Sequence, residues 1–283
     1  MSVVKSIGAA IACVVLAAGT AGAQSRPLAT QDPEAISAGQ IAVSAGLEYQ
    51  RGIFYPASGL KGNLTKMGTF EIDFGVSSMA QIELSGGLRD RLAITDRLGG
   101  PLKQMLTGTG ETTSDFEDAI IGAKIRFATE TAGRPAMAVR FATRLPNAGN
   151  ESGLGLDTTD FTFSLLAGKT VRSLRVVGNF GFGILGDPTR GDRQNDVLTY
   201  GISAARAIVQ GTEFVAELNG RANTRSGDAP VGTESRSMMR IGTRLTRSTV
   251  RIDAALLVGV TKSDPTWGFS TGLTWVFNAF KVQ

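Results

Sequence analysis

Residues 249–260 read Thr-Val-Arg-Ile-Asp-Ala-Ala-Leu-Leu-Val-Gly-Val. Every second position of this stretch is apolar, and Arg251 and Asp253 occupy positions between. Successive side chains of a β-strand point to opposite faces, whereas helical periodicity would break the apolar face. The stretch therefore predicts a strand with one apolar face and one polar face. The apolar positions are Val250, Ile252, Ala254, Leu256, Val258 and Val260.

The same period of two recurs along the chain from Gly39 onward. In residues 173–185, for example, Phe180, Phe182 and Ile184 share one face and Asn179 lies on the other. Most such segments are about ten residues long, the length that a tilted strand needs to cross a bilayer. We predict twelve strands, near residues 40–50, 67–76, 80–88, 116–127, 136–145, 158–167, 173–185, 197–208, 212–223, 235–246, 249–260 and 267–277.

The connections between these predicted strands alternate between long and short. Outer-membrane barrels have short periplasmic turns and longer external loops, and an even strand number places both termini on the periplasmic side. The longest predicted loop, 89–115, contains Leu98, Leu102, Met105 and Leu106, which we expect to fold over or into the mouth. The other long connections are expected near residues 51–66, 146–157, 186–196, 224–234 and 261–266, and the short ones near 77–79, 128–135, 168–172, 209–211 and 247–248.

Together these patterns predict an all-β fold, an antiparallel transmembrane β-barrel of twelve strands formed by residues 39–283. Such a barrel would lie in a bacterial outer membrane, in contact with lipid. A soluble β-sandwich or a periplasmic barrel would also have one apolar face on each strand, but that face would point inward. The alternation of loop lengths and the character of the final strand favour the membrane barrel.

The final predicted strand carries aromatic residues along its apolar face, among them Trp267, Phe269, Trp275 and Phe277. Aromatic rings of membrane proteins collect at the level of the lipid headgroups. An exported chain that ends on such a strand resembles the signal read by the barrel-assembly machinery. We therefore expect this machinery to contact Trp267 to Phe277. Because six residues follow Phe277, Phe280 is the alternative terminal ring if the strand continues.

The first 23 residues have the three parts of a secretory signal peptide, with Lys5 before a short apolar core and Ala21-Gly22-Ala23 as the cleavage site. The one cysteine, Cys13, lies inside this segment, so the exported chain would contain no disulfide. Loss of Lys5 lowers the formal charge from +4 to +3, which is too small to indicate a nucleic-acid partner. Residues 24–38 carry Pro, Ser and Gln and are expected to form a flexible periplasmic leader.

In a membrane barrel, the polar face of each strand lines the lumen. One role for its charges is a structural network, in which Glu213 and Glu217 pair with Arg236, Arg240 and Arg244 on the next strand. The other is a transverse field that orients a polar solute in a wet channel. We favour the network as the main role, and the two can coexist. The lumen-lining candidates are Glu71, Asp73, Glu83, Lys124, Arg126, Arg140, Arg144, Arg175, Glu213, Glu217, Arg221, Arg240, Arg244 and Arg251.

The predicted width of the barrel indicates a narrow or partly plugged pore. Eight strands leave an interior that side chains fill, whereas sixteen leave an open channel. Small residues on the polar face, including Gly75 and Gly201, either leave room for a solute or relieve the curvature of coiled strands. We favour curvature as their role.

The composition of the chain does not favour a catalytic or metal-binding site. The chain has no histidine, which excludes imidazole-based hydrolases and His-ligated zinc or haem. The glycine-rich stretch 149–155 lacks the Gly-Lys-Ser/Thr of a phosphate loop, and no carboxylate spacing fits calcium. We therefore predict no enzymatic activity, no metal and no cofactor.

The residues around the fifth and sixth predicted strands resemble a known family. Arg140-Phe-Ala-Thr-Arg-Leu-Pro-Asn-Ala-Gly-Asn150 is followed by Ser152-Gly-Leu-Gly155, then by Asp157-Thr-Thr-Asp160 before the strand Phe161 to Ala167. This order of Arg-x-Pro, a glycine-rich loop and an Asp is similar to the MetA-pathway-of-phenol-degradation-like outer-membrane proteins. The resemblance implies transport of small organic compounds, aromatic ones included. It covers this stretch well and the rest of the chain only in architecture, and it transfers no ligand residues.

We therefore expect a passive channel or uptake protein for small organic solutes. The alternative is a barrel with a closed, salt-bridged lumen that serves envelope structure or binds partners through its loops.

Overall fold

The computed structural model describes residues 26–281. The predicted signal peptide, residues 1–23, lies outside this range. Among the described residues, no helix is long and apolar enough to cross a membrane.

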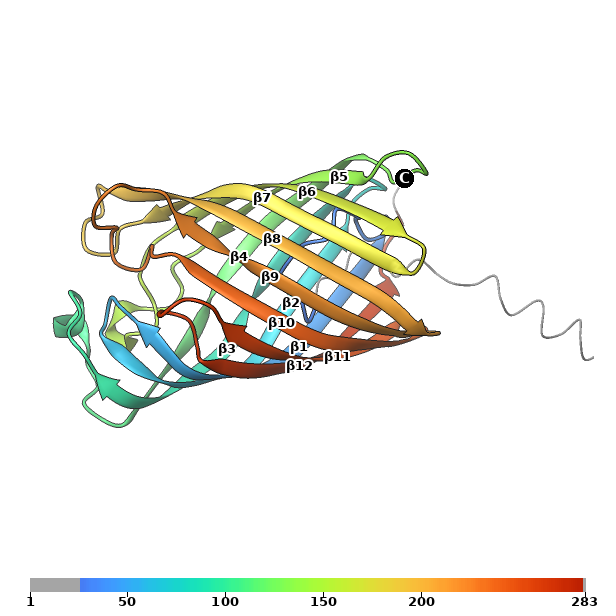
Figure 1. The fold of residues 1–283 in the computed structure, drawn as a ribbon. Coiled ribbons are helices and arrows are strands. Elements are labelled where there is room, and N and C mark those ends of the chain that lie inside the picture. The colour runs from blue at the N-terminus through green and yellow to red at the C-terminus, as the bar shows by residue number, and fades with distance from the viewer. Residues whose placement is uncertain (1–25, 282–283) are drawn as a thin grey trace, which may run out of the picture.

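Twelve antiparallel strands close into a barrel, in which each strand pairs with its neighbours in sequence and β12 pairs with β1 (Figure 1). The closing pair runs from Gln40 opposite Asn278 to Arg51 opposite Trp267. The predicted fold is thereby confirmed. The strands are β1 (Gln40–Tyr55), β2 (Leu60–Gly75), β3 (Ala80–Arg97), β4 (Thr112–Ala128), β5 (Ala136–Arg144), β6 (Asp160–Val171), β7 (Leu174–Gly186), β8 (Gln194–Val209), β9 (Thr212–Asn223), β10 (Arg236–Arg247), β11 (Val250–Gly259) and β12 (Trp267–Asn278).

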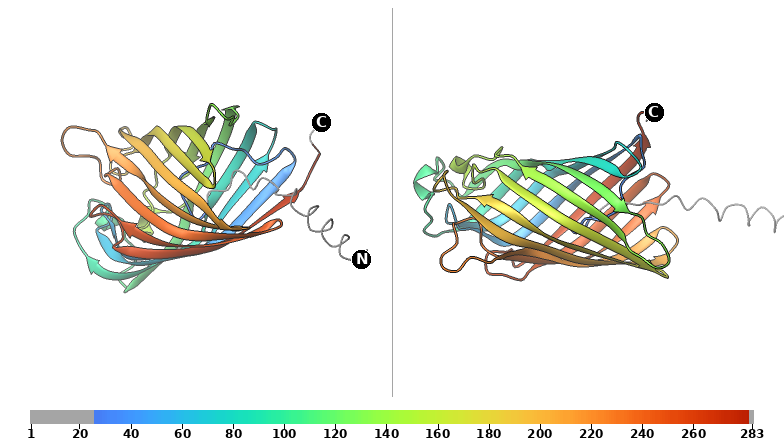
Figure 2. Two further views of the ribbon diagram at one scale, coloured as in Figure 1. Left: turned by 45° about the vertical axis from the view of Figure 1, so that its right-hand side comes forward. Right: turned by 90° about the horizontal axis from the view of Figure 1, so that it is seen from above.

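The two ends of the barrel differ in their connections. The turn end, where β1 begins and β12 ends, has short turns such as residues 210–211 and 248–249. The opposite loop end has the longer connections, including residues 98–111 and 145–159, which hold the short 3-10 helices Lys103–Met105 and Asn150–Ser152. Both ends are visible in the side views of Figure 2.

Apolar side chains cover the outside of the barrel. On β11, Ile252 is 51% exposed and Leu256 is 63% exposed, whereas Arg251 and Asp253, on either side of Ile252, are buried. The outer face of β12 likewise exposes Trp267, Phe269, Leu273 and Trp275. This arrangement is the reverse of a soluble sandwich, in which the apolar face is the buried one. The two soluble alternatives are therefore wrong.

The first four strands are longer than the alternation predicts. β1 and β2 are joined by residues 56–59 alone, so the long loop expected over 51–66 is wrong. The loop expected over 89–115 is shortened to 98–111 because β3 runs to Arg97 and β4 begins at Thr112. Most outer positions of these extensions are polar or small, for example the exposed Arg89 and Arg91. An apolar outer face is needed only against lipid, so the periodic pattern ends where the wall leaves the apolar band.

The 98–111 loop covers part of the mouth at the loop end. Leu106 packs against an apolar cluster of Ile53, Leu60, Leu64 and Leu92, to which Tyr55 and Leu154 also belong. Leu98 and Met105 are about half exposed instead. The expected fold-over of the loop is therefore met by Leu106 and not by those two residues.

Candidate functional site

Residues 26–38, here called the plug, lie inside the barrel and pack against its inner wall. The sequence predicts a flexible periplasmic leader over residues 24–38, and the structure differs because contacts with the wall hold residues 26–38 in place. Leu28 is buried with Ala205 and Val215, and Ile36 is buried with Ala42. The plug joins the wall at Gly39, whose N–H donates to the carbonyl of Gly75 at 2.8 Å.

The first half of the plug is held by polar groups from the middle of the wall. The Arg26 guanidinium donates to the Thr69 hydroxyl at 3.2 Å and to the Thr271 carbonyl at 3.1 Å. Its Nε lies 3.6 Å from the buried carboxylate of Asp253. These partners come from β2, β12 and β11, so a single side chain connects three strands.

Wall side chains also satisfy backbone groups in the first half of the plug. The Glu217 carboxylate accepts the N–H groups of Ala29 and Thr30, at 2.8 to 3.0 Å. The Asn179 amide accepts the N–H of Gln31 at 2.7 Å and donates to its carbonyl at 2.8 Å. A buried peptide N–H or C=O group without a hydrogen-bond partner destabilises the fold by about 1–3 kcal/mol. These contacts therefore allow the plug to keep an irregular backbone inside the lumen.

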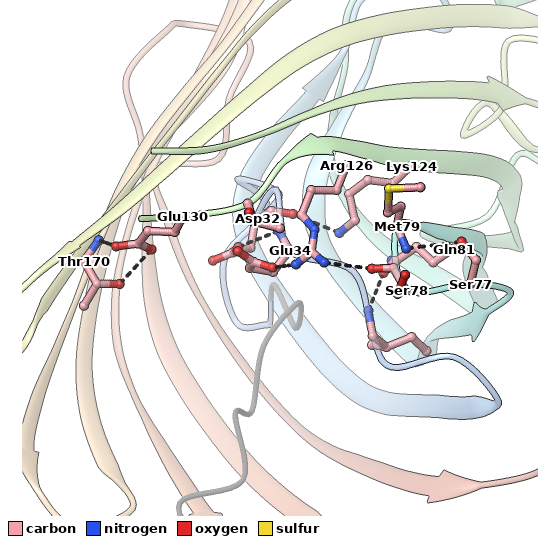
Figure 3. A network of polar contacts seen from close by, with 12 residues as sticks. Asp32, Glu34, Ser77, Ser78, Met79, Gln81, Lys124, Arg126, Glu130 and Thr170 are labelled. Carbon is pink, nitrogen blue, oxygen red and sulfur yellow. Dashed lines mark hydrogen bonds and ion pairs between the residues drawn. The ribbon is translucent and has the colours of Figure 1, made fainter. Parts of the chain in front are cut away.

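The second half of the plug is held by ion pairs with basic wall residues (Figure 3). The Asp32 carboxylate accepts two hydrogen bonds from the Arg175 guanidinium, at 2.5 and 2.6 Å. Lys124 donates to the Asp32 carbonyl at 2.9 Å, and the Glu34 carboxylate is paired with Arg126. Charge-assisted and bidentate pairs of this kind are about twice as strong as neutral hydrogen bonds.

Glycines of the wall make room for the plug. A Cβ at Gly75 would lie 2.1 Å from the Ser37 carbonyl oxygen, and a Cβ at Gly201 would lie 2.8 Å from the Thr30 hydroxyl. Both distances are too short for a real side chain at these positions. At Gly75 and Gly201 the space expected for a solute is therefore occupied by the chain's own residues, and strand curvature is not the whole explanation.

The charge of Asp32 is maintained by its partner. Burial of the Asp32 carboxyl opposes ionisation, but the hydrogen bonds and the positive charge of Arg175 outweigh burial, so the pKa of Asp32 lies below its ordinary value of 3.8. The pair is therefore fully formed at neutral pH.

Strong acid is expected to loosen the plug. Because the folded-state pKa of Asp32 is lowered, its stabilising contribution is complete above 3.8 and is lost as the pH falls through the lowered value. Conductance measured in planar bilayers should accordingly rise in that acidic range. The variant Asp32→Asn has no charge at this position, so it should conduct more at neutral pH and should lose most of the acid-induced rise in conductance. If its conductance rises in acid as much as that of the natural sequence, other groups cause the effect.

The fourteen predicted lumen residues are buried or half-buried positions that alternate with exposed apolar ones. Two of the cross-strand pairs that the sequence predicts are formed: Arg240 lies 2.7 Å from Glu217, and Arg244 lies 3.8 Å from Glu213. Arg236 instead opposes Arg221 and donates to the carbonyls of Phe54 and Ser263. Glu83 lies between Arg140 at 2.6 Å and Lys124 at 3.7 Å, a contact that the sequence does not predict. Asp73 accepts from Gln81, Arg251 donates to Thr246, and Glu71 lines a cavity beside Glu83. Their role in solute passage stays a prediction.

Arg144 and Arg221 lie toward the loop end. Arg144 pairs with Asp118 at 2.5 Å and also with Asp160, which opposes it directly in the register of β5 and β6. Arg221 donates to the carbonyls of Gly232 and Glu234 and so fixes a loop. These two arginines act mainly as anchors for the connections that follow β5 and β9.

Sequence reasoning missed a second group of lumen charges. Lys66 is paired with Glu117 and lies 3.8 Å from Asp90, and all three belong to β2, β3 or β4. Lys66 and Asp90 fall in connections predicted as loops, which is why they are absent from the predicted set. The plug acids Asp32 and Glu34 are also absent from the predicted set, because residues 24–38 are predicted to form a periplasmic leader. On the polar face of the fourth and fifth predicted strands, bases outnumber acids. This excess is the sequence feature that indicates acidic partners elsewhere in the chain.

Water-sized space remains on both halves of the plug. A cavity of about 800 Å³ at the turn end is lined by residues 32 and 34–38 together with wall residues such as Arg126 and Arg251. A second, of about 380 Å³, adjoins Arg26 to Ala29 and Gln31, and a third, of about 240 Å³, lies nearer the loop end beside Tyr55. The plug therefore fills the lumen only in part, and cavities remain along it. Within residues 26–281, no group of three His, Cys, Asp or Glu side chains is arranged to hold a metal ion.

Comparison with known proteins establishes the class of fold. No protein family and no curated protein sequence matches the chain. Among solved structures it is similar to the COG4313 outer membrane channel from Pseudomonas putida F1, with 12% identity over 87% of this chain and 98% of that chain and a TM-score of 0.62. The KdgM porin and the NanC porin each share 8% identity over 83% of this chain and 99% and 98% of theirs, with TM-scores of 0.50. The chain thus has the closed antiparallel barrel of outer-membrane channels and porins.

Proposed function

We propose that this protein is an outer-membrane channel for the passive passage of small organic solutes, and that the plug closes it in the state described. The observation that supports this function is how the lumen is filled. A barrel whose interior is packed by its own wall side chains has no removable part. Here a separate segment fills the lumen, attached to the wall at Gly39 and otherwise held by hydrogen bonds, ion pairs and two apolar side chains. Each of the polar contacts can be exchanged for water or for a polar solute.

The apolar outer face supports a place in the lipid of a bacterial outer membrane, with the turn end toward the periplasm. The final strand supports recognition by the barrel-assembly machinery through Trp267 to Phe277, of which Trp267, Phe269 and Trp275 point outward. The stretch of residues 140–167 that resembles the MetA-pathway-of-phenol-degradation-like proteins supports small organic compounds as the solutes. That stretch contains Arg140 and Arg144, two of the inward bases.

Planar-bilayer recording of the refolded full-length barrel tests this function. We expect resolvable conductance steps that are small and interrupted, because the plug must move for ions to pass. Heat-modifiable migration in a gel reports correct folding independently of conductance. A folded barrel that stays silent, both intact and with the plug removed, would instead support the alternative of a structural or interaction barrel.

The ion selectivity of the open channel is expected to depend on β10. The double substitution Arg240→Ala and Arg244→Ala removes two inward positive charges and leaves Glu217 and Glu213 without these partners. The reversal potential in a salt gradient should shift toward cation selectivity. The matched control is Arg206→Ala with Arg247→Ala, which removes two exposed arginines of the outer wall at the turn end. Equal shifts in both variants would argue against a lumen field.

A further inference from the structure

One cavity of the barrel, here called the vestibule, lies at the turn end and is lined by charged side chains of both signs. Its volume is about 800 Å³, and its lining includes four arginines and four acids among the described residues. The arginines are Arg126, Arg175, Arg244 and Arg251, all from the wall, and the acids are Asp32, Glu34, Glu130 and Glu213.

Two of the four vestibule acids belong to the plug and not to the wall. With the plug in place, the formal charges of the lining cancel. When the plug leaves, the lining keeps its four arginines and the acids Glu130 and Glu213, and it loses the two negative charges of Asp32 and Glu34. The open state therefore has a more positive chamber at this end of the barrel than the closed state.

The contacts of the plug acids describe what this chamber recognises. Arg175 binds Asp32 through two nitrogens, the fork geometry by which guanidinium recognises a carboxylate. Arg126 holds the Glu34 carboxylate, and one residue, Pro33, separates the two acids. Two carboxylates a short distance apart are thus held by two arginines of different strands, β7 and β4. A small molecule with the same pair of groups would meet the same donors.

We propose that the vestibule binds a small organic dianion with two carboxylate groups, and that this solute opens the channel by displacing Asp32 and Glu34 from Arg175 and Arg126. The inference rests on the proposed channel function and names its solute class and its mode of opening. Asp32 and Glu34 compete with the solute for Arg175 and Arg126. The solute can bind only while the two plug acids are detached from these arginines, and its apparent affinity falls in proportion to that fraction of time.

Glutarate is a suitable probe, with its uncharged diamide as the reference compound. Binding is measured by calorimetry on refolded full-length protein in detergent. The double variant Asp32→Asn and Glu34→Gln removes the competing charges without shortening the chain, and its affinity for glutarate should exceed that of the natural sequence by about tenfold or more. The double variant Arg126→Gln and Arg175→Gln should lose glutarate binding.

The matched control is Arg134→Gln with Arg172→Gln, which changes two exposed arginines at the same end of the barrel, outside the vestibule. This control should bind glutarate as the natural sequence does. The proposal is overturned if removal of the plug acids leaves glutarate affinity unchanged, or if glutarate and its diamide bind equally. Conductance separates the two proposals: a plug-deleted barrel that conducts without binding glutarate refutes the solute class alone, whereas one that binds glutarate without conducting refutes the channel.

Discussion

Deletion of residues 26–36 is expected to raise the single-channel conductance several-fold. The deletion removes Arg26, Leu28, Asp32, Glu34 and Ile36, the side chains that fill the middle of the lumen, and keeps the turn that leads into β1. The cavities on the two halves of the plug are then expected to form one path. Conductance of a wet pore depends on its narrowest section, so a change there has the largest effect available in this barrel. Planar-bilayer recordings of the intact and deleted chains give the ratio directly.

A reversible lock provides the matched control for this deletion. A Cβ at position 201 would lie 3.5 Å from the Cβ of Thr30, within the range of a disulfide. The variant Thr30→Cys with Gly201→Cys should therefore conduct poorly when oxidised and recover steps after reduction. The chain has one natural cysteine, Cys13 in the predicted signal peptide, so the exported variant forms a single bridge. Unchanged conductance in both the deletion and the oxidised lock would refute closure by the plug.

Arg144→Ala is expected to cost the barrel about 2–4 kcal/mol of its free energy of unfolding. Arg144 is the shared partner of Asp118 and Asp160, whose side chains are both only 7% exposed. Asp118 also accepts the N–H groups of Asn147 and Ala148, so it holds the following loop as well. Removal of the arginine leaves two buried carboxylates facing one another. The estimate lies below that for a fully enclosed pair because Arg144 itself is 26% exposed.

The control for this substitution is Arg190→Ala. Arg190 lies 3.7 Å from Asp192, with exposures of 60% and 78%, in the loop between β7 and β8. An exposed pair of this kind contributes less than about 1 kcal/mol. Urea unfolding of both variants in detergent micelles measures the difference. A loss for Arg144→Ala no greater than that for Arg190→Ala would show that the Asp118 and Asp160 carboxylates have other adequate partners.

The sequence predicts the part of the wall that contacts lipid, and it does so for a physical reason. Where one face of a strand contacts hydrocarbon and the other contacts water, the first must be apolar and the second polar. Apolar and polar residues therefore alternate along the sequence of the strand. β9 is found at its predicted bounds, residues 212–223, and β11 within one residue of each end. Above the apolar band both faces meet water, so β3 continues through Arg89 and Arg91 without an apolar face to indicate it.

The plug has no such local indication. It is short, contains Pro27 and Pro33, and forms no strand or helix. Its order comes from partners that are distant in sequence, such as Thr271, 245 residues from Arg26, and Glu217, 188 residues from Ala29. No window of neighbouring residues can contain that information. The cross-strand pairs of β9 and β10 could be predicted because adjacent strands fix which residues oppose one another.

The same contacts that obstruct the lumen also brace the wall. The plug connects residues of β2, β3, β4, β7, β9, β11 and β12, which lie all around the circumference. A cylinder of twelve strands without internal supports can flatten, whereas one with supports at several angles keeps its cross-section. Passage and rigidity are therefore thermodynamically linked in this protein: whatever deforms the cylinder weakens the plug, and whatever expels the plug leaves a softer cylinder. If the barrel is the channel proposed above, lateral pressure from the surrounding membrane should be one of the forces that set how often it is open.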